Sequence, residues 1–545
     1  MAPSTHTVTN QAPPLVGYDV FSCDRALTES VERHLAPELL GEARDELSLL
    51  GWAMGSAQVR EWGELANANP PRLRTHDRYG HRIDEVDFHP AWHRLLGKAV
   101  GAGLTDAWGR PGGHVRRAAG LLVVSQAEAG HVCPVSMTHA AVPALRAEPE
   151  LAEVWEPAAT SHVYERELRP VAEKPGALLG MALTEKQGGS DVRGNTTEAR
   201  PLPADGEYVL TGHKWFCSAP MSDAFLVLAR APGGLTCFLL PRVLPDGSRN
   251  AFALQRLKDK LGNRSNASAE VEFDGTTWAR RVGEEGRGIR TVIDMVAATR
   301  LDCVLGSAAL MRQAVAQAVH HCAYREAFGG VLIEKPLMRN VLADLAIESE
   351  AATVLGMRLA AAYDADERAL LRIAVPVAKY WVTKRCTAVA AEALECLGGN
   401  GYVEESGMPR LLRESPLNSV WEGSGNVQAL DVLRALRTGP GAFDAFLREV
   451  GAARGADHRL DRAIRGLLVE LADLSDPERM EAGARRLVER MALVLQGSLL
   501  VRWAPPEVAD AFCASRLGGD GGATFGTLPH TLDLRAVVER ARVGA

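Results

Sequence analysis

The chain has 545 residues, of which 46% are hydrophobic and 24% charged, and its formal net charge is −7. This length and composition are typical of a globular protein with several domains, and the net negative charge gives no overall attraction to nucleic acid or to an anionic membrane. No apolar run is long enough to span a membrane, and the first residues lack the pattern of a secretory signal. The nine cysteines include no Cys-x-x-Cys pair, which disfavours both a disulfide framework and a zinc ribbon. We therefore expect a cytoplasmic protein with reduced thiols and no membrane partner.

The N-terminal region combines an arm with a helical segment. Residues 1–40 have a mixed composition that predicts an extended arm, and such an arm either packs on a neighbouring part of the protein or frays. From about 40 to 180 the apolar spacing is helical. His89 and His93 have a spacing that would place both on one helical face, as in some metal sites. No third ligand follows in an ordered pattern, so no metal is predicted.

A β domain is predicted next, at residues 181–285. Its short apolar runs are typical of strands and are separated by Asp-Gly or Gly-Gly turns; they cover 208–212, 224–229, 235–240 and 269–273. The glycines at 283–288 stand in the reverse order of the dinucleotide fingerprint and are expected to lack a strand–helix context, and those at 398–401 are expected to end a helix. No phosphate-loop sequence occurs either. Neither a Rossmann site for NAD nor a P-loop for ATP is therefore predicted.

Helical spacing returns after the β region. Long helices are expected at about 289–328, 336–364 and 374–397, with Pro336 at a first helical position and glycines 398–399 beyond the last helix. The order helical, β, helical is not the alternating pattern of a parallel sheet, so it predicts an α+β, mainly α, architecture. The expected domains are 1–180, 181–285, 286–439 and an additional helical domain at 440–545.

One acidic residue stands on a sharp turn at the entrance to a predicted helix. Trp421 and Glu422 precede a tight turn, Gly423–Asn426, and an apolar stripe follows. Ser424 or Asn426 can cap this helix, and its free N–H groups can bind an anion or a polar ring edge. Glu422 would then lie beside a ligand site, where a carboxylate can act as a general base. The alternative is that Glu422 only complements the helix dipole.

A second candidate site is a glycine turn after the first strand of the β region. Thr184 ends this strand, and the turn that follows carries Ser190 and Asp191. Exposed main-chain N–H groups and hydroxyls at such a turn can bind ring nitrogens, carbonyls and phosphates. The alternative is an ordinary polar loop between strands.

Several segments, in order along the chain, resemble motifs of the acyl-CoA dehydrogenase family. Trp421–Asn426 resembles the loop that carries the catalytic base of that family. Further matching segments resemble the flavin loop, the strand whose Trp covers the flavin, a Lys-x-Gly-x-Arg segment, the Arg-x-x-Phe-Gly motif and the adenine-side loop; they are Met181–Asp191, Lys214–Ser218, Lys260–Arg264, Arg325–Gly329 and Cys396–Tyr402. The resemblance extends from the first residues to about residue 440. Within the family it is closest to the AidB-type branch, named for an alkylation-response flavoprotein.

The resemblance implies a flavoenzyme fold with FAD as cofactor. An N-terminal helical domain, a β domain and a C-terminal four-helix domain would assemble as a homotetramer. Glu422 would be catalytic and Arg300 would lie at the substrate. The residues implied to bind the cofactor come from both the β region and the later helices; they are Met181, Leu183, Thr184, Gly189, Ser190, Trp215, Cys217, Ser218, Arg325, Phe328, Gly399, Ser424 and Asn426.

The reaction implied by the resemblance is the α,β-dehydrogenation of an acyl-CoA or another acyl thioester. Glu422 would take the α-proton while the flavin N5 accepts hydride from the β-carbon, and electrons would leave to an electron-transfer flavoprotein or to oxygen. Three positions depart from the family pattern. Pro336 and Glu395 stand where many members have a Gln, and Ala297 stands where many members have an acid that contacts pantetheine. The acyl carrier therefore stays open between CoA and a carrier protein.

A function of another class is a flavin-containing protein that binds duplex DNA in the alkylation response, with weak or vestigial dehydrogenase activity. The resemblance associates DNA binding with the extra C-terminal block. Residues 440–545 contain 14 Arg and no Lys against 15 acidic residues, so they carry no net basic charge. The best basic stripe is Arg479, Arg485, Arg486 and Arg490, with acidic residues between them. A solvated helical domain that covers the tetramer would have the same mixed charge.

Overall fold

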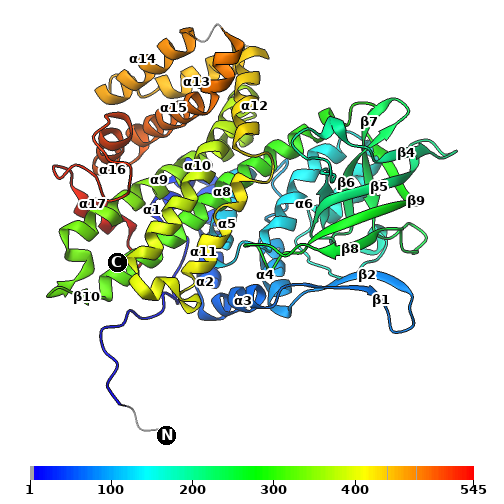
Figure 1. Ribbon diagram of the computed structural model, residues 1–545, viewed down its shortest axis with the longest axis horizontal. Helices are drawn as coiled ribbons and strands as arrows, with labels where there is room; N and C mark the ends of the chain where they lie inside the picture. The colour runs from blue at the N-terminus through cyan, green and yellow to red at the C-terminus, as the bar shows by residue number, and fades with distance from the viewer. Residues whose placement is uncertain (1–4, 439, 474–475, 545) are drawn as a thin grey trace. The chain divides into compact units, whose positions relative to one another are not determined.

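The computed structural model describes residues 5–438, 440–473 and 476–544 (Figure 1). The chain divides into two compact units, one formed by Gln58–Asp302 and the other by Met1–Ala57 together with Cys303–Ala545. The long helix α8 (Gly288–Tyr324) belongs partly to each. Within the described ranges, no helix has the length and apolar character needed to cross a membrane.

The first half of the unit Gln58–Asp302 is mainly helical. Its elements are α3 (Ala57–Ala68), the antiparallel hairpin β1 (Arg72–His76) and β2 (Arg82–Asp87), α4 (Pro90–Gly101), α5 (Gly113–Ala127), α6 (Val132–Leu145) and α7 (Pro149–Ala159). His89 is the N-cap of α4, because its Nδ1 accepts a hydrogen bond from the Ala91 N–H at 3.2 Å. His93 Nδ1 lies 2.7 Å from the Tyr164 hydroxyl. The two histidines therefore have separate structural contacts.

A seven-stranded sheet forms the second half of this unit (Figure 1). Its strands are β3 (Leu179–Ala182), β4 (Glu198–Pro201), β5 (Glu207–Ser218), β6 (Ala224–Ala231), β7 (Gly234–Pro241), β8 (Ala253–Leu257) and β9 (Ser268–Val282). Pairing runs from β6 through β4, β5, β9 and β7 back to β6, so these strands close a ring. β3 adds to β6 and β8 adds to β9. The strands expected at 208–212, 224–229, 235–240 and 269–273 all lie in this sheet. β9 ends at Val282 and α8 begins at Gly288, so the glycines at 283–288 do lie between a strand and a helix, contrary to our expectation.

The continuous apolar run of β6 reflects burial on both faces. Phe225 and Val227 pack in a core between strands, whereas Leu226 and Leu228 pack in a second core with residues of α6 and α7. A strand buried on both sides loses the alternation of apolar and polar residues that marks a half-exposed strand. This arrangement fixes the end of the neighbouring β3, and with it the start of the loop that carries Thr184.

The other unit is helical. Its elements before the C-terminal block are α1 (Arg25–His34), α2 (Pro37–Met54), the hairpin β10 (Glu326–Ala327) and β11 (Gly330–Val331), α9 (Pro336–Asp364), α10 (Arg368–Cys396), α11 (Met408–Glu414) and α12 (Gly425–Thr438). Pro336 is the first residue of α9, as predicted. The extended arm expected over residues 1–40 was wrong for its second half, because α1 and the start of α2 are helical there. α8 ends at Tyr324 rather than near 328, because the chain turns there into the β10–β11 hairpin. α10 begins at Arg368 and contains Pro376 in its interior, so the expected start at 374 was wrong.

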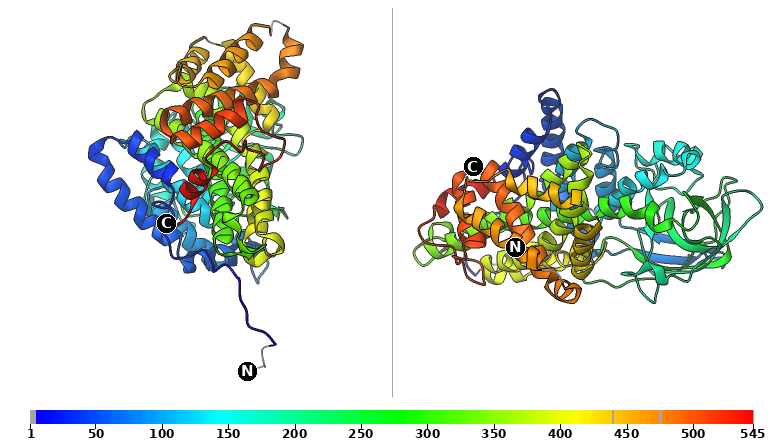
Figure 2. Two further views of the ribbon diagram at one scale, coloured as in Figure 1. Left: turned by 90° about the vertical axis from the view of Figure 1, so that its left-hand side faces the viewer. Right: turned by 90° about the horizontal axis from the view of Figure 1, so that it is seen from above.

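The C-terminal block packs against α9, α10 and α12 (Figure 2). Its helices are α13 (Pro440–Gly451), α14 (His458–Asp473), α15 (Pro477–Trp503), α16 (Pro506–Phe512), a π-helical turn at Cys513–Leu517 and α17 (Leu534–Ala541). Gly439, at which we placed the boundary of this block, lies outside the described residues. Glu449 of α13 accepts hydrogen bonds from Arg358 of α9 at 2.7 Å and from Arg502 at 2.5 Å. The bond from Arg502 lies within the block, whereas the ion pair with Arg358 connects the block to α9 in addition to its packing against α9, α10 and α12.

Candidate functional site

The Glu422 loop has an unusual backbone. Glu422 has φ 57° and Gly423 has φ 93°, so two successive residues leave the right-handed region. A left-handed conformation costs a non-glycine residue about 1–2 kcal/mol, and such residues concentrate at sites where the strain serves a function. The sequence indicates Glu422 as a candidate but does not reveal its left-handed backbone, since nothing in a glutamate side chain favours that conformation.

Buried side chains on two helices hold the main chain of this loop. The Lys379 ammonium, on α10, donates to the Trp421 carbonyl at 2.8 Å and to the Gly423 carbonyl at 2.7 Å. The Gln428 side-chain amide, on α12, donates to the Glu422 carbonyl at 3.0 Å and to the Gly423 carbonyl at 2.9 Å. Neither residue was among the predicted site residues.

Trp421 is also fixed by a chain of side-chain hydrogen bonds. Its indole N–H donates to Asn418 Oδ1 at 2.9 Å, and Asn418 Nδ2 donates to the Ser307 hydroxyl on α8 at 3.1 Å. The half-buried indole is therefore anchored beside Glu422.

The predicted cap residues take different positions at the start of α12. Ser424 directly precedes the helix, and its carbonyl accepts the Gln428 N–H at 3.0 Å, as an N-cap residue does. Asn426 is exposed and lies within the first helical turn. A Cβ on Gly425 would lie 2.7 Å from Lys384 Cε, the far end of a flexible side chain, so a larger residue there would displace the Lys384 side chain. Ser424 thus keeps the position expected of a cap, whereas Asn426 does not.

In the unit Gln58–Asp302, the loop after β3 folds back on Thr184. Met181 lies in β3, Leu183 and Thr184 follow it, and a Cβ on Gly189 would lie 2.5 Å from the Thr184 hydroxyl oxygen. This close approach explains why residue 189 is a glycine. Ser190 is exposed at the end of the turn. The hydroxyls of Ser190 and the half-buried Thr184 are therefore the groups of this segment that can meet a polar ring edge, since the N–H groups of Glu185, Lys186 and Gly188 are bonded within the protein.

A buried ion pair anchors the same loop. The Glu185 carboxylate accepts hydrogen bonds from the Lys214 ammonium at 2.7 Å and from the Thr196 N–H at 2.7 Å. Burial would raise the pKa of Glu185, but these bonds outweigh it and lower the pKa to about 2. Sequence analysis missed this pair, although Lys214 directly precedes the predicted flavin-covering Trp215.

A β-bulge in β5 sets the directions of the next predicted residues. The register with β9 shifts between Lys214 and Cys217. Lys214 and Cys217 are buried, while Trp215 is half-buried and the neighbouring Phe216 is exposed. The Cys217 side chain packs in the sheet core, where burial raises the pKa of its thiol. Cys217 as a whole residue is buried, so the half-buried Ser218 is the accessible one of the two.

The surroundings of Trp215 are cationic. The Lys258 ammonium lies 3.1 Å from the centre of an aromatic ring of Trp215, and Lys186 and Arg256 lie within 6 Å of it. An aromatic face, exposed hydroxyls and nearby positive charge form a donor set that suits a flavin with its phosphates. The residues of this unit therefore fit FAD.

The predicted phosphate-binding motif lies on the β10–β11 hairpin of the other unit. Arg325 is half-buried and its guanidinium donates to the Asn10 carbonyl. Phe328 has φ 51° and its side chain is 95% exposed. Gly399 is exposed in the turn Gly398–Tyr402, where a Cβ would meet nothing within 4 Å. Arg300, the predicted substrate residue, is half-buried on α8.

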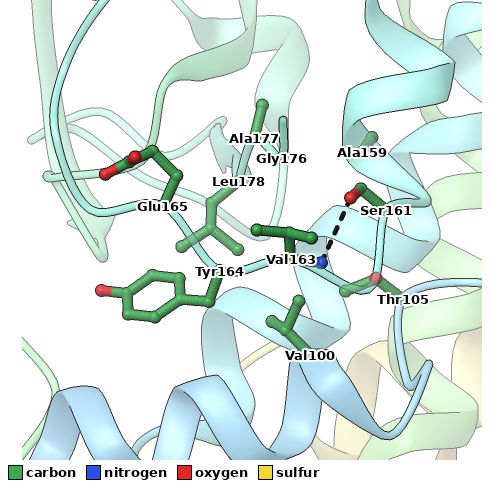
Figure 3. Close-up of a pocket in the computed structure, with 10 residues that line it drawn as sticks. All are labelled: Val100, Thr105, Ala159, Ser161, Val163, Tyr164, Glu165, Gly176, Ala177 and Leu178. Carbon is green, nitrogen blue, oxygen red and sulfur yellow. Dashed lines mark hydrogen bonds between the residues drawn. The ribbon is translucent and has the colours of Figure 1, made fainter. Parts of the chain in front are cut away.

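A small cavity in the unit Gln58–Asp302 does not belong to this site (Figure 3). Val100, Thr105, Tyr164 and Leu178 are among the residues that line it, and its volume is about 10 Å³. This is room for about one water molecule. It can hold neither an acyl chain nor a flavin.

The basic stripe of α15 is largely paired with acidic residues. Arg479 lies 3.5 Å from Asp476, Arg486 lies 3.4 Å from Glu470, and Arg490 also pairs with Glu470. Arg485 packs over the Tyr380 ring at 5.8 Å. Most of the stripe is therefore a mixed-charge face.

Comparisons with known proteins identify the class. The model of the AidB N-terminal domain matches residues 10–166, that of the acyl-CoA dehydrogenase middle domain matches 180–276, and that of the acyl-CoA dehydrogenase C-terminal domain matches 286–437. AidB of Escherichia coli strain K12 is 46% identical over 98% of both chains. Acyl-CoA dehydrogenase family member 11 of Caenorhabditis elegans is 29% identical over 89% of this chain and 84% of its own.

Two solved structures share the fold over nearly the whole chain. The crystal structure of Caenorhabditis elegans ACDH-11 in complex with C11-CoA has a TM-score of 0.84 and 26% identity, covering 94% of each chain. The structure titled Bd2924 apo-form has a TM-score of 0.83 and 28% identity, covering 91% of this chain and 99% of its own.

The chain belongs to the acyl-CoA dehydrogenase family and, within it, to the AidB-type branch. It is an acyl-CoA dehydrogenase-type enzyme with FAD as its cofactor. The predictions of family, fold class, enzyme class and cofactor are confirmed. The roles of individual residues stay predictions.

Proposed function

We propose that this enzyme removes hydrogen from the α- and β-carbons of an acyl thioester, with Glu422 as the base. The observation that carries this proposal is the left-handed backbone of Glu422, held by buried side chains at the entrance to α12. A residue kept in a strained conformation by its surroundings is typical of a functional position. A glutamate that only complemented the α12 dipole would need no such strain.

The carboxylate and the main-chain N–H of Glu422 have different roles in the proposed reaction. The Glu422 carboxylate takes the α-proton, and the Glu422 main-chain N–H donates to the thioester carbonyl, whose oxygen gains negative charge as the proton leaves. FAD, when bound, supplies the acceptor for the hydride that leaves the β-carbon. The product is a 2,3-enoyl thioester. We propose an electron-transfer flavoprotein or oxygen as the final acceptor.

Cofactor binding is proposed for the residues that the family motifs indicate. Thr184, Ser190 and the main chain at 217–218 would bind the polar edge of the flavin, and Trp215 would cover a ring face. Arg325 would pair with the pyrophosphate, since its planar guanidinium matches two phosphate oxygens. Met181, Leu183, Gly189, Phe328, Gly399, Ser424 and Asn426 complete the proposed set.

The proposed substrate is an acyl-CoA or a related acyl thioester. The Caenorhabditis elegans relative was crystallised with C11-CoA, and its fold covers nearly all of this chain. Arg300 is proposed to contact the substrate. Ala297, on the same helix, carries no acidic group for pantetheine, which keeps a carrier-protein thioester as the second choice.

A homotetramer is proposed for the assembly. Three large apolar side chains of the helical unit are strongly exposed, namely Phe328 at 95%, Tyr402 at 82% and Leu337 at 78%. Exposed apolar groups of this size are typical of surfaces that another chain covers. We further propose the domain division 1–180, 181–285, 286–439 and 440–545.

Anaerobic bleaching of the flavin absorbance tests the proposed reaction. The holoenzyme is mixed with acyl-CoAs of increasing chain length. The fall of the absorbance band of oxidised flavin, at about 450 nm, is then followed. We expect bleaching with at least one thioester. Failure with every chain length, and with carrier-protein thioesters, would overturn the proposal.

A further inference from the structure

We propose that Lys379 and Gln428 are positioning residues for Glu422: they hold its main chain in the left-handed conformation and thereby direct both its carboxylate and its N–H. This inference deepens the proposed function and rests on Glu422 being the base. Neither residue belongs to the motifs by which the site was predicted, but both donate hydrogen bonds to the main chain of the Glu422 loop.

Lys379 brings a charged group to the main chain of the Glu422 loop. Its side chain is almost fully buried, with the residue 1% exposed, and its ammonium bonds the carbonyls of Trp421 and Gly423. An ammonium is costly to bury unless its N–H groups find acceptors. Here these acceptors are main-chain carbonyls of the loop that carries Glu422, so the loop and the lysine depend on each other.

Gln428 also donates hydrogen bonds to the main chain of this loop. The residue is 1% exposed, and its side-chain amide donates to the carbonyls of Glu422 and Gly423. Three successive carbonyls, from Trp421 to Gly423, therefore accept hydrogen bonds from two buried side chains. This pattern offsets the cost of the left-handed backbone, which is about 1–2 kcal/mol for a residue with a side chain.

Fixing the Trp421 carbonyl also fixes the proposed donor to the substrate. The Trp421–Glu422 peptide bond is trans, so the Glu422 N–H lies in the same plane as the Trp421 C=O and points the opposite way. Lys379 thus determines the direction of the N–H that we propose for the thioester carbonyl. A cation bound to the carbonyl also polarises the peptide unit, which strengthens its N–H as a donor.

The simpler explanation is that both residues only stabilise the fold. In that case their loss lowers the melting temperature and changes the rate in proportion to the folded fraction. A positioning role predicts something different, namely a fully folded, FAD-loaded enzyme that binds substrate and reacts slowly. The split between the bleaching rate constant and the substrate dissociation constant separates these explanations.

The experiment compares Lys379→Met, Lys379→Arg and Gln428→Leu with the parent holoenzyme. Lys174→Met is the control: Lys174 is also buried, and its ammonium donates to the carbonyls of Glu165 and Glu167 at 3.0 and 2.8 Å and to the Asp223 carboxylate at 2.6 Å, none of which belongs to the Glu422 loop. FAD content, melting temperature, substrate affinity and the limiting rate of anaerobic bleaching are measured for each. Amide hydrogen exchange of residues 420–424 reports on the loop itself.

We expect Lys379→Met to lower the limiting rate by ~10²-fold and Gln428→Leu by about tenfold, with FAD and substrate still bound. Lys379→Arg should recover part of the rate, because a guanidinium can also donate to two carbonyls. Exchange of the loop amides should accelerate in the Met and Leu variants. Lys174→Met should lower the melting temperature only.

Failure of this inference can be told apart from failure of the proposed function. If Glu422→Gln stops bleaching but Lys379→Met retains the parent rate, the positioning role is wrong while the base assignment stands. If Glu422→Gln bleaches like the parent, the base assignment is wrong. If no thioester bleaches the parent flavin, amide hydrogen exchange of residues 420–424 tests the positioning role. Exchange in Lys379→Met that is as slow as in the parent overturns that role.

Discussion

Asn10 holds the segment that begins with Arg325. The Asn10 carbonyl accepts a hydrogen bond from the Arg325 guanidinium. The Asn10 side-chain amide pairs with the neighbouring Glu326 main chain, accepting from its N–H at 2.7 Å and donating to its C=O at 2.8 Å. Asn10 has φ 55°, a conformation that asparagine tolerates better than most residues. The N-terminal arm therefore fixes the start of the hairpin that carries Phe328.

Replacing Arg325 by Ala should weaken FAD retention. We expect the purified parent protein to be yellow and to carry non-covalent FAD, and the variant to lose about 10- to 100-fold in FAD affinity, since a charge-assisted pair with phosphate is lost. Binding is measured by titrating apoprotein and following flavin fluorescence. A colourless parent that takes up no FAD on reconstitution would refute the whole cofactor assignment.

Replacing Asn10 by Ala tests whether the arm acts through Arg325. The side chain loses both bonds to Glu326, worth about 1 kcal/mol net at an exposed site, so FAD affinity should fall about fivefold. Thr9→Ala, in the adjacent exposed position of the arm, is the control. In the background of Arg325→Ala the Asn10 substitution should have no further effect. An additive loss in the double variant would show that the arm acts on the cofactor by another route.

Glu422→Gln should stop substrate bleaching and leave FAD bound. The amide keeps the shape of the side chain but cannot take a proton, and the loss of a general base costs ~10²-fold or more in rate. Stopped-flow absorbance under argon gives the rate, and the flavin spectrum gives the occupancy. A variant that bleaches as fast as the parent would reduce Glu422 to a residue that complements the α12 dipole.

The sequence was sufficient for the fold class and for the candidate base, because both depend on local patterns. Glycine turns and an apolar stripe predicted the entrance of α12, and Glu422 stands directly before it. The partners of that loop could not be predicted in the same way. Lys379 lies inside an ordinary buried stretch of α10, and only the folded chain shows that its ammonium meets the carbonyls of Trp421 and Gly423.

The face of β5 on which each side chain lies could not be predicted from the sequence, for a related reason. Regular alternation would put Trp215 and Cys217 on the same face of the strand. The bulge between Lys214 and Cys217 breaks that alternation and turns Cys217 into the core. A bulge depends on the pairing with β9, which is distant in sequence. Likewise, His89 and His93 share a metal-like spacing, but a helix cap and a tyrosine hydroxyl account for their contacts.

A buried Glu–His pair should make the protein sensitive to acid. Glu128 accepts hydrogen bonds from the His131 main-chain N–H at 2.8 Å and from the Ser265 hydroxyl at 2.6 Å, and His131 Nδ1 lies 2.9 Å from its carboxylate. Burial would raise the pKa of Glu128, but the contacts with His131 and Ser265 outweigh it and hold the pKa at about 2.

The sign of the pH dependence follows from this lowered pKa. An unfolded glutamate has a pKa of about 4.3, so the folded state favours the ionised form. The stabilisation is complete above about pH 4.3, is lost as the pH falls towards 2, and is on the order of 3 kcal/mol. Denaturant unfolding between about pH 2 and about pH 7 measures this loss of stability. Glu128→Gln should flatten the acid limb, whereas Glu153→Gln, at an exposed position of α7, should leave it unchanged.

Binding of duplex DNA should be weak and insensitive to the arginines of α15. A duplex-binding surface must neutralise several phosphates, which makes affinity fall steeply with salt. Arg479, Arg486 and Arg490 already pair with acidic residues, which leaves Arg485, packed over Tyr380, as the one member of the stripe without a carboxylate partner among the described residues.

Labelled duplex is titrated with the full chain and with a variant in which all four arginines are changed to Gln, at several salt concentrations. The full chain is used because the C-terminal block packs against α9 and α10, so that its removal would expose apolar surface. We expect equal, weak binding by both proteins; a steep salt dependence that disappears in the variant would restore DNA binding as a function of this protein.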